Sequence, residues 1–174
     1  MSKGNIRKAE ESCFKEQKKQ LSIMNVVCFI TLYRMGWDVD RIIDRFNIST
    51  EIWRECVANK LSAFELLERE TGIEIALDGE RPYTDFGQLR YRNETMTPEE
   101  YIYSLHRRKR WVAPMILACL SLALRRAEDW SDEQLAEFIA KTDELRKEHG
   151  ESVKTYVDLM ISETGYTPKI WGES

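Results

Sequence analysis

The chain aligns with itself, and this internal similarity constrains the fold more than any other feature of the sequence. A shift of 93 positions places Trp37 on Trp130 and the Glu-Thr-Gly tripeptide at 70–72 on the same tripeptide at 163–165. Upstream of the tryptophan the shift is 91 positions, and it aligns the two basic runs of the chain. The match predicts a duplicated structural unit. The alternative is two unrelated helical hairpins that share generic amphipathic patterning.

Helix start and stop signals recur in both halves. The expected N-caps are Asp38, Ser62, Thr97, Ser131 and Thr155, and the expected stops include Gly72 and Gly165. Residues 62–65, 97–100 and 155–158 resemble capping boxes, and Pro98 takes the first helical position. We therefore predict helices at 5–35, from 38 onward, at 62–72, at 97–127 with a kink at Pro114, at 131–148 and at 155–165.

These signals predict an all-α fold. It consists of two pseudo-repeated three-helix units, residues 1–72 and 97–174, joined by an irregular or hairpin-containing connector at 73–96 and packed as one compact domain. With only 8 Gly and 4 Pro among 174 residues, the composition favours long helices over many short strands. In the first helix we expect Phe14, Leu21, Met24 and Val27 on the apolar face.

The sequence gives no sign of export or of a membrane span. The longest apolar run, residues 111–124, is shorter than the roughly 20 residues that cross a bilayer. The N-terminus is polar and charged, and the four cysteines have no CxxC spacing. We therefore expect a cytoplasmic protein with free thiols and no membrane partner.

Charge is distributed unevenly along the chain. The formal net charge is −4, yet residues 1–20 carry six Lys/Arg against three acids, and residues 101–126 carry six Lys/Arg and no acid. Basic side chains at these places suit a polyanion such as nucleic acid, and the connector adds two arginines beside Tyr83 and Tyr91. The alternative is a solvated face paired with acids elsewhere in the chain. The candidate polyanion-binding residues are Lys15, Lys18, Lys19, Arg90, Arg92, Arg107, Arg108, Lys109 and Arg110.

Residues 38–59 also resemble a helix-turn-helix. In that interpretation Asn47 begins the turn, and Thr50, Arg54 and Asn59 belong to a recognition helix. The apolar spacing continues unbroken through residues 47–49, however, which favours one continuous helix. The helix-turn-helix is therefore the weaker alternative.

We expect no catalytic residues, no metal ligands and no cofactor. The two histidines and four cysteines lack zinc-ligand spacing, and the chain has no P-loop, no GxGxxG and no nucleophile elbow. The acids at the start of the second helix suit its macrodipole. The prediction is a protein that works by binding, not an enzyme.

Residues 130–148 and 156–165, with a looser copy at 37–72, resemble small uncharacterised helical proteins of phages and prophages of Gram-positive bacteria. The resemblance implies a phage-type accessory or inhibitor protein that acts on a protein or nucleoprotein target, for example a host defence nuclease. A DNA- or RNA-binding regulator is the alternative. Whether the protein forms a homodimer is left open.

Overall fold

The computed structural model describes residues 3–77 and 96–168, and this part of the chain is helical, as predicted. No strand of a sheet occurs within these residues. None of the helices in the described ranges is both long and apolar enough to cross a membrane. The seven helices are α1 (Lys3–Arg34), α2 (Val39–Asn59), α3 (Ala63–Thr71), α4 (Pro98–Arg108), α5 (Val112–Glu128), α6 (Asp132–Glu148) and α7 (Val153–Thr164).

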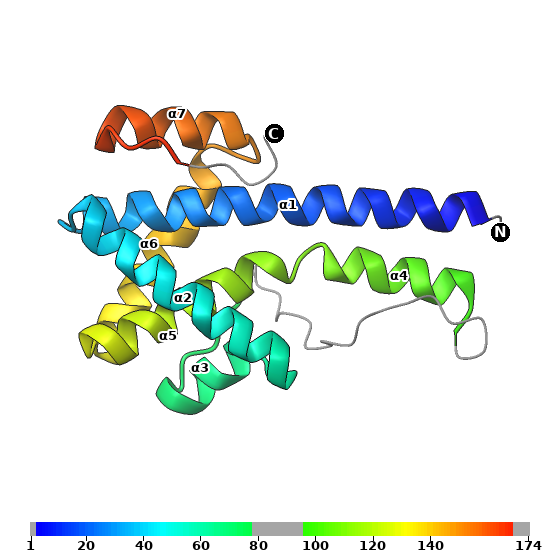
Figure 1. The fold of residues 1–174 in the computed structure, drawn as a ribbon, viewed down its shortest axis with the longest axis horizontal. Helices are drawn as coiled ribbons and strands as arrows, with labels where there is room; N and C mark the ends of the chain where they lie inside the picture. The colour runs from blue at the N-terminus through cyan, green and yellow to red at the C-terminus, as the bar shows by residue number, and fades with distance from the viewer. Residues whose placement is uncertain (1–2, 78–95, 169–174) are drawn as a thin grey trace.

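The long helix α1 forms the axis of the molecule, and α4 and α5 run beside it in the same direction (Figure 1). The remaining helices cross between the two halves of the chain. α2 and α3 pack on α5, whereas α6 and α7 pack on α1. The second and third helices of each half therefore cover the long helical segment of the other half.

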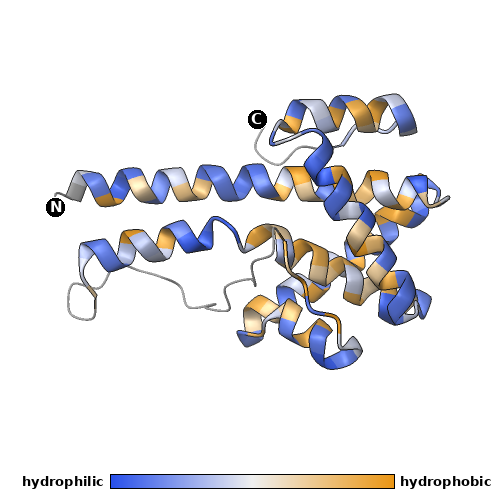
Figure 2. Ribbon diagram, turned by 180° about the vertical axis from the view of Figure 1, so that it is seen from behind, coloured by the Kyte–Doolittle hydropathy of each residue, from blue (hydrophilic) through white to orange (hydrophobic). Residues whose placement is uncertain are grey.

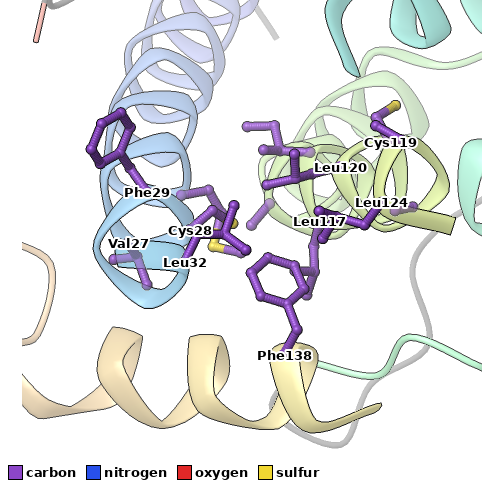
Figure 3. Packing of buried hydrophobic residues seen from close by; sticks show 14 of the residues in the cluster. Val27, Cys28, Phe29, Leu32, Leu117, Cys119, Leu120, Leu124 and Phe138 are labelled. Atoms are coloured by element: carbon purple, nitrogen blue, oxygen red, sulfur yellow. The ribbon is translucent and has the colours of Figure 1, made fainter. Parts of the chain in front are cut away.

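The main core lies where α1, α5 and α6 meet. Residues 112–124 of α5 are all buried, and the C-terminal half of α1 faces them with its apolar side chains. Figure 3 shows Phe138 of α6 pointing between Cys28 and Leu32 of α1 and Leu117 of α5. Phe138 is completely buried. Figure 2 shows the same division, with apolar segments gathered in the body and polar ones toward the N-terminus of α1.

The helix expected at 97–127 is two helices, and the prediction of a kink at Pro114 was wrong in position. The break lies at residues 109–111, so that Pro114 occupies the first turn of α5. A proline has no N–H to donate to the residue four positions earlier, and its ring clashes with that carbonyl. For Pro114 that earlier residue is Arg110, so α4 ends before Arg110 and does not continue into α5. Trp111 then stacks on Trp53 of α2, with ring centroids 5.7 Å apart.

Most of the predicted caps are confirmed. Asp38 and Ser62 accept from the backbone N–H three residues later, and Thr97 and Ser131 form complete capping boxes. The Thr155 prediction was wrong, because Ser152 caps α7 one turn earlier and its hydroxyl accepts from the Thr155 N–H.

The two Glu-Thr-Gly segments end their helices in the same way. Gly72 and Gly165 are left-handed, with φ of 75° and 70°. The threonine hydroxyl before each glycine donates to the carbonyl four residues earlier and accepts the N–H of the residue after the glycine. The identical tripeptides thus encode identical local structure.

The turn required by the helix-turn-helix alternative does not form, because α2 continues without interruption through residues 47–49. Its buried positions, Ile42, Ser49, Ile52 and Cys56, follow a single helical face. The connector is described only as far as Leu77, with Ile75 almost fully buried. The hairpin prediction, and Tyr83, lie outside the described residues.

Candidate functional site

Two helical segments extend side by side beyond the body of the molecule (Figure 1). We call residues 3–20 of α1 together with residues 97–110 the arm. The arm has its own small core of Cys13, Tyr101 and Leu105. Tyr101 donates its hydroxyl to Glu10 Oε1 at 2.7 Å, and the Cys13 thiol donates to the Leu105 carbonyl at 3.4 Å. Burial and the Glu10 carboxylate raise the pKa of Tyr101 to about 12, so this tie persists at neutral pH.

The arm brings together the two basic runs that the sequence keeps apart. It carries ten Lys/Arg and five Glu, while the rest of the chain carries 16 Lys/Arg and 25 Asp/Glu. The side-chain amide of Gln17 donates to the Arg108 carbonyl at 3.3 Å, so the runs lie at the same height on neighbouring helices. The arm is therefore a basic projection on an acidic body.

The basic residues occupy both flanks of the arm and do not share one face. On one flank Lys109 Nζ donates to Ser12 Oγ at 3.0 Å, and Lys19 lies two turns beyond Ser12 on the same side of α1. Lys18 lies on the opposite flank, where its Nζ is 4.7 Å from the centroid of the Phe14 ring. An extended polyanion must wrap the arm to meet both sets.

Some of these basic groups are already engaged within the protein. Lys19 pairs with Glu151 at 2.6 Å and lies 3.8 Å from Glu16. The hydrogen bond that Lys19 donates to Glu151 raises the pKa of Lys19. Arg107 and Arg110 are exposed and also interact with other groups of the protein. For Lys19, Arg107 and Arg110, the alternative that these charges interact within the protein therefore applies in part.

Other basic residues of the arm are less constrained. Lys15 and Lys18 are exposed, and neither forms an ion pair within residues 3–77 and 96–168. The Nε atom of Arg108 is buried in the arm and has no hydrogen-bond partner there. Lys15 and Lys18 are therefore the arm's most available cations, since the Arg108 Nε is buried. Arg90 and Arg92 lie outside the described residues.

Two aromatic side chains of the arm were not predicted as part of a site. Phe14, expected on the apolar face of the first helix, is 61% exposed, and Tyr103 is 66% exposed. The apolar face of the arm instead runs through Ile6, Ala9 and Cys13, whose spacing of three and four residues could have shown that Phe14 lies off it.

The helix-turn-helix candidates lie on α2, outside the arm. On α2, the Thr50 hydroxyl and the Asn59 amide each donate to a carbonyl of the preceding turn. Arg54 pairs with Glu51 on the same helix. These three side chains therefore belong to the surface of one continuous helix.

Groups suited to catalysis are sparse in the described structure. A pocket of about 190 Å³ between α1 and α6 is smaller than the usual range for small-molecule sites, and its Arg34 is tied to Glu163. The four cysteines are buried, and burial raises the pKa of each thiol, which disfavours the nucleophilic thiolate. Over the ranges 3–77 and 96–168, no three His, Cys, Asp or Glu side chains gather as a metal site.

Comparison with protein-family models, curated proteins and solved structures gives no match.

Proposed function

We propose that this protein is a non-enzymatic binding protein that contacts a protein or nucleoprotein target through its basic arm. The observation that carries the proposal is the arm itself, in which two distant basic runs meet on a projection from an acidic body. A projection of this charge attracts polyanionic surfaces, because each neutralised phosphate releases counterions. A phage-type accessory or inhibitor role, with a host defence nuclease among the targets, agrees with this mode of action.

The proposal includes two pseudo-repeated units, with α1, α2 and α3 matching α4–α5, α6 and α7. In a parallel pair related by a twofold axis, equivalent residues lie at the same height. The contacts between α1 and α4 join residues 91 or 92 positions apart, close to the offset at which the two basic runs align. Trp37 and Trp130, which align at the second offset, meet edge to face with centroids 5.6 Å apart.

Two ion pairs support the same relation. Arg34 at the end of α1 binds Glu163 at the end of α7, and Arg126, one residue after the position that aligns with Arg34, binds Glu70 at the end of α3. Each pair joins the long segment of one half to the Glu-Thr-Gly cap of the other. A twofold relation also accounts for basic residues on both flanks, since it carries one run to the side opposite the other.

The arm is tested as a polyanion contact by chromatography on immobilised heparin. The variant Lys15→Glu/Lys18→Glu reverses two exposed charges, and the matched control Arg54→Glu/Arg69→Glu makes the same change in net charge on α2 and α3. We expect the wild type and the control to elute at similar salt and the arm variant well before them. Equal elution of all three would overturn the assignment of the arm.

The second candidate is a regulator that binds DNA or RNA directly. It is favoured by Lys15 and Lys18, which are exposed and make no ion pair in the described ranges. A mobility-shift assay at about 50 mM salt separates it from the first candidate. A shift of free nucleic acid by the wild type that the arm variant does not produce supports direct binding. Arm-dependent retention on heparin alone supports a target that supplies its own polyanionic surface.

A further inference from the structure

We infer that the arm binds single-stranded nucleic acid, with bases stacking on Phe14 and Tyr103 and phosphates held by Lys15 and Lys18. This inference rests on the proposed role of the arm as the polyanion contact. It adds the chemistry of the ligand, which is an unpaired strand that presents both base faces and phosphates.

Among residues 3–77 and 96–168, the most exposed aromatic rings belong to the arm. Phe14 and Tyr103 are 61% and 66% exposed, whereas the other exposed large hydrophobic residues of the described ranges, Val57, Leu61 and Ile161, are aliphatic. The tyrosine and tryptophan rings that the structure describes outside the arm are buried or half-buried. Base stacking requires an accessible π-face, and in the described structure these two rings offer the largest.

The Phe14 ring is accompanied by positive charge. Lys18 lies one turn further along α1, with its Nζ 4.7 Å from the ring centroid. Gln17, which precedes Lys18 in α1, donates to the Arg108 carbonyl, so the second basic run lies at the same height as this ring. A nucleotide combines a flat ring with an anion. This flank offers the complementary pair, an aromatic ring with a cation beside it.

The two-flank distribution of charge favours a single strand over a duplex. Lys109 and Lys19 are on the flank of Ser12, and Lys18 is on the flank of Phe14. A rigid duplex meets one flank at a time and keeps its bases paired inside. A flexible strand can bend around the arm and reach both flanks, and its unpaired bases can reach the rings.

The test compares anisotropy titrations of the full-length protein with a labelled oligothymidylate and with a duplex, each of about 20 nucleotides per strand, at about 50 mM salt. We expect Phe14→Ala and Tyr103→Ala each to weaken single-strand binding by about 5- to 100-fold. Phe14→Trp should retain it, and Val57→Ala, which removes an equally exposed side chain from α2, should leave it unchanged. Since both rings are exposed, the midpoint of thermal unfolding should not change in any of these variants.

The lysines are tested by the salt dependence of the same titration. The plot of log K against log salt has a negative slope, and the variant Lys15→Gln/Lys18→Gln should make it shallower by about 1.4. Each phosphate contact to a single strand contributes about 0.7 to the steepness of this slope. An unchanged slope would show that these lysines do not meet phosphates, and it would overturn their place in the site.

The outcomes separate this inference from the proposed function. Full single-strand affinity in both ring variants, or duplex binding as tight as single-strand binding, overturns the stacking site. Absence of oligonucleotide binding also overturns it, but leaves the proposed function standing if heparin retention still depends on the arm. If heparin retention does not depend on the arm, both the stacking site and the proposed function are overturned.

Discussion

The ion pairs Arg34–Glu163 and Arg126–Glu70 should contribute equally to stability if the two halves are equivalent. Both are bidentate, with shortest N···O distances of 2.6 and 2.5 Å. Their side chains are similarly exposed, at 44% and 26% in the first pair and 41% and 31% in the second. Partly exposed pairs contribute about 0.2–1 kcal/mol, and bidentate geometry places these in the upper half of that range. We therefore predict a coupling energy of about 0.5–1 kcal/mol for each.

Two double-mutant cycles in urea measure these energies. In each cycle the arginine, the glutamate and then both are replaced by alanine, so that the helix-propensity effects of the single changes cancel. The two couplings should agree within about 0.3 kcal/mol, which is the usual precision of additivity. The Arg34–Glu163 coupling should also vanish in acid. The arginine lowers the pKa of Glu163, so the contribution is complete above the unfolded pKa of about 4.3 and is lost as pH falls through the lower folded value.

The equivalence of the halves fails if one pair couples by about 1 kcal/mol and the other by nothing measurable. The contacts at the two Glu-Thr-Gly caps would then be similar in geometry but different in energy. If both coupling energies were close to zero, the magnitude inferred from the bidentate geometry would be wrong. The equivalence of the two halves would still stand.

Three further predictions concern stability. Phe138→Ala should lower the free energy of unfolding by about 3–5 kcal/mol in urea titrations, because this completely buried ring fills the space between α1 and α5; a loss under about 1 kcal/mol would contradict that packing. Asn47→Ala should raise the free energy of unfolding by about 0.5 kcal/mol, since the residue is exposed inside a continuous helix, whereas destabilisation would indicate a turn. Glu128→Gln should cost about 1 kcal/mol at pH 7 and progressively less in acid, because Arg41 and Arg45 lower the pKa of Glu128 and its contribution is lost as pH falls through that lowered value; a cost that does not change with acidification would show that charge is not the cause.

Helix boundaries were the most predictable part of this fold. A cap is a hydrogen bond between residues three or four positions apart, so Thr97 with Glu100 and Ser131 with Gln134 could be identified from residue order alone. The failures were also local. Ser152 and Thr155 are both good N-cap residues, and the structure uses the earlier one, whose hydroxyl accepts the Thr155 N–H.

The candidate site was predictable in composition but not in shape. The basic runs are plain in the sequence, but the flank of the arm on which each residue lies is not, since a helix spreads consecutive residues around its circumference. The spacing of Ile6, Ala9 and Cys13 places Phe14 off their face, but only the structure shows that α4 covers that face and leaves Phe14 exposed.

The sequence by itself determined that the chain is helical, where most of its helices begin and end, and that two segments carry excess positive charge. These properties follow from interactions within a few residues and from counting. Only the tertiary structure decided that the two basic segments form one arm and which flank each lysine occupies. It also decided that α2 and α3 pack on α5 while α6 and α7 pack on α1. Those features depend on contacts between residues about 91 positions apart, such as Gln17 with Arg108, and no local pattern specifies them.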